Sequence, residues 1–176
     1  MSNLFLTKFD TPIGEMIAGA DDSALLLLEF TDTNRHLSEI NQICKFHKLN
    51  QISAENAIIK QTISQMYEYF DGKRTSFDIP IKFTGTDFQK SVWDLLSKIE
   101  YGTTISYKTE AEILNNPTAI RAVANANGKN KISIIIPCHR VIGSSGNLSG
   151  YGGGVHRKEY LINLEKSFIN STKTNQ

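Results

Sequence analysis

The first thirty residues contain three short apolar runs separated by turn-forming residues. The runs occupy 4–9, 15–20 and 24–30, and the segments between them contain DTPIG at 10–14 and DD at 21–22. Short apolar runs bounded by Pro, Gly and Asp are typical of strands joined by tight turns. The pattern therefore predicts an antiparallel meander at the start of the chain.

Two helical patterns follow the meander, at 33–49 and 54–70. Apolar side chains of the second pattern lie three or four residues apart, at Ile59, Ile63, Met66 and Phe70. This spacing places them on one face of a helix, which we expect to pack into a core. Residues 76–83 are expected to form an extended connector or an edge strand, because Pro80 cannot donate to a sheet ladder.

A second group of helical patterns begins near Gly85. Thr86 and Gln89 have the spacing of a capping box, in which both side chains bond free backbone N–H groups at a helix start. The helix that they begin continues through Ile99 and is ended by Gly102. This sharp start indicates a new structural unit.

Two shorter helices then predict a helix-turn-helix. Ser106 is the expected N-cap of the first helix and Asn116 that of the second, with Pro117 at its first position. The second helix covers 118–127 and ends at Gly128. The tight Asn-Asn-Pro turn between the helices is typical of this motif. The remaining expected elements are a strand at 132–136, a glycine-rich loop at 143–154 and a helix at 155–165.

These elements predict the α/β (α+β) fold class in two domains. An antiparallel-sheet α/β domain covers 1–84, a mainly helical domain covers 85–168, and 169–176 form a frayed tail. The 176 residues, 40% hydrophobic and 21% charged, are typical of a globular protein. No stretch reaches the roughly 18 apolar residues of a membrane helix, and the start lacks the pattern of a signal peptide. With two cysteines, a reducing cytoplasmic location is expected.

Charge is distributed unevenly between the two halves. Residues 1–84 carry 8 Lys+Arg against 11 Asp+Glu, and residues 85–170 carry 10 against 7. A basic second half favours a polyanionic partner such as nucleic acid. Charges that merely solvate a surface are an equally open interpretation.

The chemistry of the chain is concentrated in IIIPCHRVI at 134–142. Pro137 ends the apolar strand, and Cys138, His139 and Arg140 follow at once. A thiol is nucleophilic as the thiolate, and His139 can serve as the base that forms it, directly or through one water. A third group must then orient the imidazole. A buried structural cysteine remains the alternative.

A zinc site is the competing interpretation of these residues. Cys44, His47, Cys138 and His139 are all possible ligands. No CxxC or HxxxH pair occurs, however, and adjacent Cys and His rarely bind one metal. We therefore expect no metal, and a core position for Cys44.

Six sequence blocks between Thr86 and Glu165 occur together, in the same order, in one known family. They are FQKSVW, TISY, NPTAIRAVANANGKN, PCHRVIGSSG, GYGGG and KEYLINLE. In these blocks the chain resembles the O6-alkylguanine-DNA alkyltransferases. The resemblance implies a winged-helix-like DNA-binding and alkyl-acceptor domain at 85–168. For 1–84, which match in pattern only, it implies a ribonuclease-H-like domain.

The resemblance also implies an activity. Members of this family move an alkyl group from O6 of guanine, and in some cases from O4 of thymine, irreversibly onto their own cysteine. The target base must first leave the DNA stack. The chain is then expected to be a monomer that repairs double-stranded DNA, needs no cofactor and acts once. Lys131 departs from the family pattern, which often has a proline there.

Roles for individual residues follow from the resemblance by position. Cys138 matches the acceptor, His139 its base, Glu165 the carboxylate that orients the histidine, Asn130 the brace of the turn, and Tyr107 the hydroxyl that donates to the base. The expected DNA contacts are Arg121, which would fill the vacated space, with Tyr107, Lys108, Asn116 and Ser144. The expected pocket residues are Val141, Tyr151, Gly152, Lys158 and Asn127.

Two other functions remain open at this point. A helix-turn-helix module or damage sensor would bind DNA without any transfer. A cysteine hydrolase would use Cys138, His139 and Glu165 over many turnovers, and would not depend on Arg121.

Overall fold

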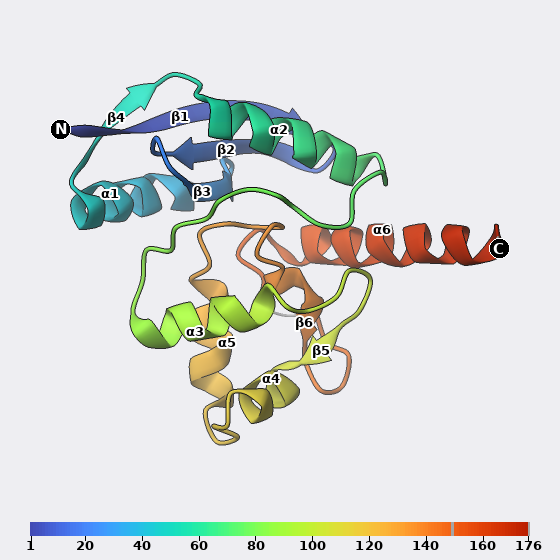
Figure 1. Ribbon diagram of the computed structural model, residues 1–176. Helices are drawn as coiled ribbons and strands as arrows, with labels where there is room; N and C mark the ends of the chain where they lie inside the picture. Colours follow the sequence, from blue (N-terminus) through green and yellow to red (C-terminus); the bar gives the residue numbers. More distant parts are fainter. Residues whose placement is uncertain (149, 176) are drawn as a thin grey trace. The chain divides into compact units, whose positions relative to one another are not determined.

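The computed structural model describes residues 1–148 and 150–175 of the chain. The backbone divides into two compact units, Met1–Thr84 and Gly85–Gln176. Figure 1 traces both units from the N-terminal strand to the C-terminal helix.

The N-terminal unit is a four-stranded sheet with two helices. Its elements are β1 (Ser2–Thr11), β2 (Gly14–Ala20), β3 (Leu25–Phe30), α1 (Arg35–His47), β4 (Leu49–Ser53) and α2 (Ala57–Phe70). The strand order is β3-β2-β1-β4. β1, β2 and β3 form the expected antiparallel meander, whereas β4 pairs with β1 in parallel. The sheet is therefore mixed and not purely antiparallel as predicted. The sequence did not predict β4, because its residues lie between two helical patterns.

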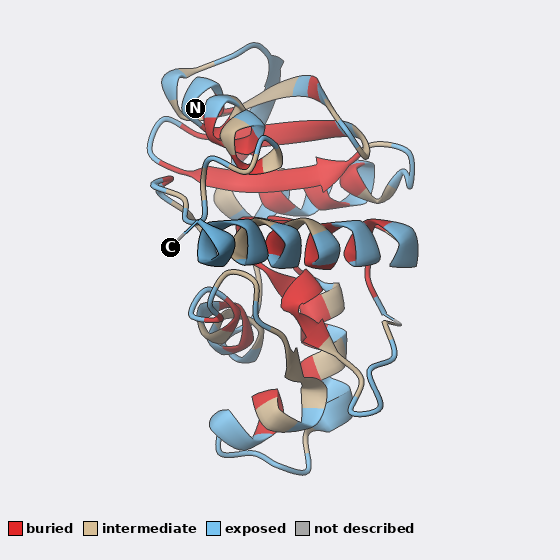
Figure 2. Ribbon diagram, turned by 90° about the vertical axis from the view of Figure 1, so that its right-hand side faces the viewer, coloured by how far each residue is buried: buried red, intermediate tan, exposed pale blue. Residues whose placement is uncertain are grey.

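The two helices cover opposite faces of this sheet. Leu4 and Leu6 of β1 pack with Ile40 and Ile43 of α1, whereas the Phe9 ring meets Tyr67 of α2. Alternate residues of a strand point to opposite faces, so these contacts place the helices on different sides. All six residues of β3 are consequently buried, and Figure 2 shows the buried sheet.

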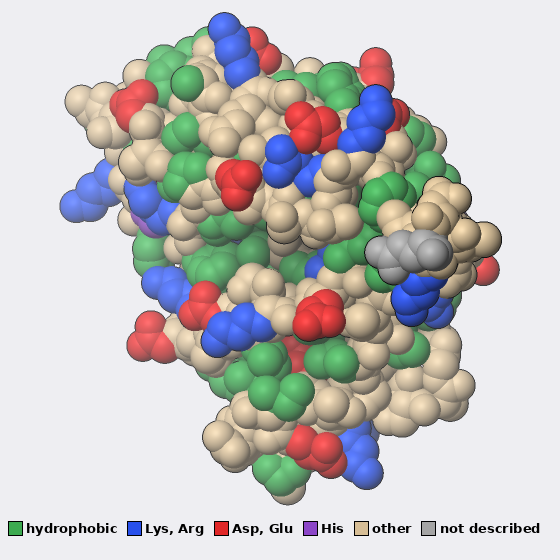
Figure 3. Space-filling view, turned by 45° about the vertical axis from the view of Figure 1, so that its right-hand side comes forward, with side chains coloured by type: hydrophobic (Ala, Val, Ile, Leu, Met, Phe, Trp, Pro, Cys, Tyr) green, Lys and Arg blue, Asp and Glu red, His purple; other side chains and the backbone are tan. Residues whose placement is uncertain are grey.

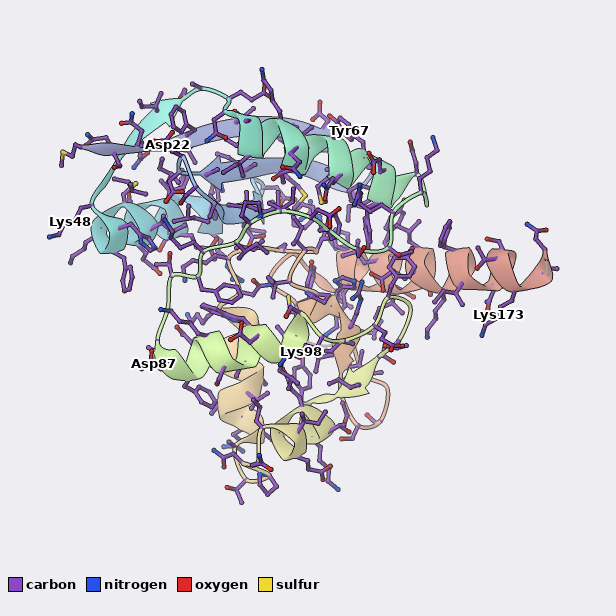
Figure 4. All side chains as sticks on the ribbon, viewed as in Figure 1. Asp22, Lys48, Tyr67, Asp87, Lys98 and Lys173 are labelled. Atoms are coloured by element: carbon purple, nitrogen blue, oxygen red, sulfur yellow. The ribbon has the colours of Figure 1, made fainter. Side chains whose placement is uncertain are left out.

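The C-terminal unit is mainly helical. Its elements are α3 (Asp87–Leu96), β5 (Ile105–Ser106), α4 (Tyr107–Ile113), α5 (Ile120–Gly128), the 3-10 helix η1 (Cys138–Arg140), β6 (Val141–Ile142) and α6 (Val155–Thr174). β5 and β6 form a small parallel sheet. The predicted capping box is confirmed at the start of α3, whose first residue is labelled in Figure 4. Ser106 caps α4 as predicted.

The helix-turn-helix consists of α4 and α5, with a longer connection than predicted. α5 begins at Ile120, and its N-cap residue Ala119 makes no side-chain cap bond. Asn116 is therefore not the N-cap; its carbonyl instead accepts from the N–H of Ala119 in a turn. Asn115, just before it, has a left-handed φ of 57°. Asn tolerates this conformation better than most residues, so the turn suits its sequence.

The strand predicted at 132–136 does not exist. Residues 133–135 form a turn, with a single bridge residue before it and a bend after it, and Ile134 has a φ of 72°. A β-branched residue rarely adopts a left-handed backbone, so surrounding contacts must hold it there. Ile132, Ile134 and Ile136 are all buried. The apolar run is therefore a buried turn, and periodicity cannot distinguish this from a buried strand.

The last helix is longer than predicted. α6 continues past Glu165 to Thr174, so residues 169–174 are helical and not a frayed tail; Gln176 lies outside the described residues. Lys173 is labelled near the helix end in Figure 4. Phe168 meets the ring of Tyr101 edge-on, at a centroid distance of 6.0 Å. Apolar contacts of this kind explain why the helix extends.

No described helix is both long enough and apolar enough to cross a membrane. On the face drawn in Figure 3, acidic and basic side chains lie interspersed over the surface.

Candidate active site

Cys138 begins the 3-10 helix η1, directly after the buried turn, and its side chain is 9% exposed. Asn130 connects the turn to the thiol. Its Nδ2 donates to the carbonyl of Ile136 (2.8 Å) and to Sγ of Cys138 (3.3 Å), and its Oδ1 accepts from the N–H of Ile132 (2.9 Å). One buried amide thus fixes both ends of the turn and orients the sulfur.

His139 and Glu165 form the second part of the site. Nε2 of His139 lies 2.7 Å from Oε1 of Glu165, and both side chains are buried. The carboxylate comes from the middle of α6, a helix that also buries Leu161 and Ile162 on the same face. Packing of that apolar face places Glu165 against η1. The third group that a Cys-His pair needs is therefore present.

Arg140 completes this cluster. Its Nε and Nη2 donate to the two oxygens of Glu165, each at 3.0 Å, and its Nη1 donates to the carbonyl of Ile99 (2.6 Å). The N–H of Gly102 donates to Oε2 of Glu165 at 3.0 Å. Burial alone would raise the pKa of Glu165, but His139 and Arg140 outweigh it and lower the pKa to about 2. Glu165 is therefore a carboxylate at neutral pH.

The charge of Glu165 decides the tautomer of His139. Burial lowers the pKa of His139, against the opposing effect of Glu165, so the ring is neutral. An ionised carboxylate only accepts hydrogen bonds, so Nε2 of the neutral ring must carry the proton. Nδ1 is then the basic nitrogen, and it is buried without a bond to any described residue. A neutral imidazole with a free lone pair is suited to take the thiol proton.

Tyr107 and Lys158 lie in the same unit. Nζ of Lys158 donates to the hydroxyl of Tyr107 at 3.3 Å, and Lys158 is fully buried. Burial lowers the pKa of Lys158, whereas the acidic groups Cys138 and Glu110 act to raise it. Burial raises the pKa of Tyr107 to about 12. The hydroxyl therefore keeps its proton at neutral pH.

Glu110 and Asn127 form a buried pair between α4 and α5. Nδ2 of Asn127 donates to Oε2 of Glu110 at 2.6 Å. Burial raises the pKa of Glu110 to about 7, although Asn127 and Lys158 act to lower it. Neither Oε1 of Glu110 nor Oδ1 of Asn127 has a partner among the described residues. Asn127 thus bonds to a buried carboxyl, and its role in the pocket stays a prediction.

Four of the five expected DNA contacts are exposed, whereas Tyr107 is only partly exposed. Arg121, Lys108, Asn116 and Ser144 are all exposed. The first three belong to the helix-turn-helix, and Ser144 lies in the loop after β6.

The remaining pocket residues flank Tyr107. Val141 is buried in β6, opposite Ile105. Tyr151 is buried and Gly152 exposed. A Cβ added to Gly150 would lie 3.3 Å from the Tyr107 hydroxyl. This short distance places the loop at 150–152 beside Tyr107.

Three functional groups were missed in the sequence. Arg140 carried a signal, because an arginine directly after a buried Cys-His pair must be buried with a partner. Glu110 lies three residues after Tyr107, on the same face of α4. Gly102 acts only through its backbone, so its residue type gave no signal.

Within 1–148 and 150–175, no three His, Cys, Asp or Glu side chains gather in a way that would hold a metal ion. Cys44 is half-buried in α1, and burial raises the pKa of its thiol. It packs beside the core residues of the N-terminal unit.

The fold and site define a class of protein: a two-unit α/β protein whose helical unit combines a helix-turn-helix with a buried Cys-His-Glu arrangement. Comparisons with known proteins identify the family. Residues 4–83 match the ribonuclease-like domain of 6-O-methylguanine DNA methyltransferase, and residues 87–167 match its DNA-binding domain.

Individual relatives agree over almost the whole chain. The methylated-DNA–protein-cysteine methyltransferase of Mycobacterium leprae is 41% identical over 167 residues, covering 95% of each protein. That of Methanosarcina acetivorans is 37% identical over 93% of this chain and 99% of its own. The crystal structure of Mycobacterium tuberculosis O6-methylguanine methyltransferase has a TM-score of 0.79 at 39% identity, covering 95% of this chain and 94% of that one.

The chain belongs to the methylated-DNA–protein-cysteine methyltransferase family. The predicted family and the α/β fold class are confirmed. A structure of the Mycobacterium tuberculosis relative in complex with DNA has a TM-score of 0.80 at 38% identity, covering 93% of this chain and 94% of that one.

Proposed function

We propose that this protein repairs alkylated DNA by moving the alkyl group of O6-alkylguanine, and of O4-alkylthymine, irreversibly onto Sγ of Cys138. The observation that carries this proposal is the buried Cys138 beside a neutral His139, whose tautomer is set by Glu165. The relatives named for this activity, and the one solved with DNA, support the same substrate class. The protein acts as a monomer in the cytoplasm.

The transfer begins when the Cys138 thiol loses its proton. Nδ1 of His139 accepts the thiol proton, directly or through one water, and Glu165 stabilises the imidazolium that forms. The sulfur then forms a bond to the alkyl carbon while the bond from that carbon to O6 breaks, and the electron pair stays with the base. Asn130 keeps the sulfur oriented. The product is a thioether, which water does not readily hydrolyse, so each molecule acts once.

The departing base needs its negative charge neutralised. The Tyr107 hydroxyl accepts a hydrogen bond from Lys158, and in this proposal it donates its own proton to the base. Because its pKa is about 12, the hydroxyl acts as a hydrogen-bond donor, with the Lys158 cation behind it. Asn127, Val141, Tyr151 and Gly152 line the space for the base.

The base reaches this site by leaving the duplex. Exposed Arg121 at the start of α5 enters the stack and fills the vacated space, while Lys108, Asn116 and Ser144 hold the DNA backbone. The helix-turn-helix lies in the minor groove, which carries little sequence information. This suits a protein whose target occurs in any sequence.

The chain's two cysteines provide a matched test of the acceptor. Protein is incubated with excess duplex DNA that contains O6-methylguanine, and each cysteine peptide is measured by mass spectrometry. We expect one methyl group per molecule, on the Cys138 peptide only. Cys44→Ala should keep the transfer and Cys138→Ala should abolish it. Repaired DNA with an unmodified Cys138, or more than one repaired base per molecule, would refute the proposal and favour a hydrolase.

Base flipping has its own test. A 2-aminopurine next to the lesion brightens when the neighbouring base leaves the stack. Arg121→Ala should lose this signal and slow the transfer by about 10- to 100-fold, because unstacking costs a few kcal/mol. Lys98→Ala removes the same charge from an exposed position in the same unit, and should change neither. Equal effects of both variants would mean that Arg121 contributes only charge.

A further inference from the structure

Glu110 is a fully buried acid with one described hydrogen-bond donor. Oε2 accepts from Nδ2 of Asn127 at 2.6 Å. Oε1 is buried, and so is Oδ1 of Asn127, and neither has a partner in the described part of the chain. Both atoms accept hydrogen bonds, and a buried acceptor without a donor destabilises the folded protein. The pair is therefore short of one donor.

A single proton on Glu110 would supply this donor. A carboxylic acid and a primary amide can form a closed pair: the amide N–H donates to one carboxyl oxygen, and the acid O–H donates to the amide oxygen. The first of these bonds is already in place. A proton on Oε1 would provide the second and satisfy both unpartnered atoms.

The proton on Glu110 matters because Lys158 lies in the same cluster. It is fully buried, its Nζ donates to the hydroxyl of Tyr107, and two acidic groups, Glu110 and Cys138, act on it. One buried cation thus has two acids near it. If both acids were ionised, their two negative charges would both act on this one cation and would repel each other, and like charges are costly in a protein interior.

We propose that Glu110 is a positioning residue that holds a proton in the Asn127 pair, and so reserves the Lys158 cation for the thiolate of Cys138. This role rests on Cys138 being the acceptor proposed above. While Glu110 is neutral, Lys158 stabilises the thiolate and supports Tyr107. Once Glu110 loses its proton, it competes for the same cation and disfavours the thiolate. Burial, which raises the pKa of Glu110 to about 7, agrees with this order of ionisation.

The groups around Glu110 account for its charge balance. Asn127 faces it from α5, whose one ionisable side chain, Arg121, is exposed. β5 and β6, which also pack on α4, carry no ionisable side chain. Lys158 of α6 and Tyr107 of α4 itself complete the cluster. Glu110 and Cys138 are thus the two acids that share Lys158.

Glu110→Gln is the natural test, because a glutamine amide reproduces the neutral acid. It can donate to Oδ1 and accept from Nδ2 of Asn127, yet it never ionises. The rate at which iodoacetamide labels the Cys138 peptide is measured from about pH 5.5 to about pH 9 by mass spectrometry, a readout that needs no DNA. Glu112→Gln removes an exposed carboxylate from the same helix and is the matched control.

We expect Glu110→Gln to label at the wild-type rate near pH 6 and about 10-fold faster near pH 8, because an ionised Glu110 repels the thiolate and the glutamine removes that charge. Glu112→Gln should follow the wild type at every pH. Superimposable wild-type and Glu110→Gln profiles would overturn the proposal. Slower labelling of Glu110→Gln at high pH would overturn it too, because the thiolate would then depend on an ionised Glu110.

A second measurement does not depend on the variant's rate. Infrared difference spectra of the wild type should show the C=O stretch of a neutral buried carboxylic acid below pH 7, and this band should be missing from Glu110→Gln. No such band at pH 6 would sink the proposal. Single-turnover transfer from O6-methylguanine DNA is followed in parallel. If transfer fails while the labelling profiles differ as expected, the proposed function is wrong, and only the effect of Glu110 on the Cys138 thiolate is supported.

Discussion

Glu165 and Glu110 are both buried in the helical unit, yet their surroundings set their charges differently. Glu165 receives hydrogen bonds from His139, from two nitrogens of Arg140 and from the backbone of Gly102. Among the described donors, Glu110 has Asn127 alone. The pKa is about 2 for the first carboxyl and about 7 for the second. Burial penalises both charges, and donors and cations decide which of them survives.

This difference assigns a separate task to each carboxyl. A fixed charge at Glu165 holds His139 as a neutral base with a defined tautomer. A proton at Glu110 leaves the Lys158 cation to other groups. In the proposed mechanism, Glu165 therefore provides a permanent charge beside the proton acceptor His139. The neutral Glu110 leaves the Lys158 cation to the thiolate. The predictions below test how far these two regions differ.

The largest expected effect is on the Glu165 region. Glu165→Leu leaves the charge of Arg140 buried without its carboxylate, and Arg140→Leu does the reverse. Each single substitution should lower the free energy of unfolding by about 3–5 kcal/mol, because a broken buried pair leaves an uncompensated charge. The double variant should lose much less than the sum of the two. Urea unfolding of all four proteins gives the coupling energy; additive losses would show that the pair is not the cause of the charge at Glu165.

The next effect concerns the base itself. His139→Ala should slow single-turnover transfer by about 100-fold or more near neutral pH, because the thiol loses its proton acceptor. The loss should shrink as pH rises, since hydroxide in solution then forms the thiolate. Quenched-flow measurement over a pH series tests this. A loss that stays constant with pH would assign His139 a structural role.

The sequence predicted the two regions unequally. Cys138, His139 and Glu165 were predicted because ordered sequence blocks surround them, and the structure pairs Glu165 with His139, the neighbour of Cys138. The turn that carries Cys138 was predicted as a strand, because Ile134 in a left-handed backbone leaves no trace in hydrophobic periodicity. β4 was missed because a short, largely exposed strand after a helix resembles a continuation of that helix.

Contacts over long sequence separations limited the rest. The sequence analysis assigned no role to Glu110, because only the packing of α4 on α5 places it against Asn127. Arg140 reaches Ile99 and Glu165 from separate elements. Such contacts depend on tertiary packing, which local patterns do not record. The sequence therefore predicted the chemical groups better than their electrostatic surroundings.

A smaller effect distinguishes the two carboxyls through stability. Because the folded-state pKa of Glu110 is raised from 4.5 to about 7, the folded protein binds the extra proton between these values. The stabilisation from the raised pKa of Glu110 is full below about pH 4.5 and is lost as pH rises to about 7. Above that pH, Glu110 causes no further change in stability. The free energy of unfolding of Glu110→Gln, relative to that of the wild type, should therefore rise by up to about 3 kcal/mol as pH increases from 4.5 to 8.

Urea unfolding of both proteins at several pH values measures this gain, with Glu112→Gln as the exposed control. A relative stability that does not change with pH would mean that Glu110 is ionised throughout, as Glu165 is. Glu165 makes the opposite contribution: its pKa is lowered to about 2, so its stabilisation is present above about pH 4.5 and is lost as pH falls toward 2.

The smallest effect concerns Gly102, whose backbone N–H donates to Glu165. Gly102 has a φ of 76°, and a Cβ there would lie 2.0 Å from Cδ1 of Ile169. Gly102→Ala should therefore cost about 1–2 kcal/mol of unfolding free energy. Gly128→Ala is the matched control, because a Cβ in α5 meets nothing within 4 Å and should stabilise the helix by about 0.5–1 kcal/mol.

Adding Ile169→Ala to Gly102→Ala removes the clash but not the backbone strain, so it should recover only part of the loss. Full recovery would show that the left-handed backbone at Gly102 costs nothing, and that this glycine is needed only to make room for α6.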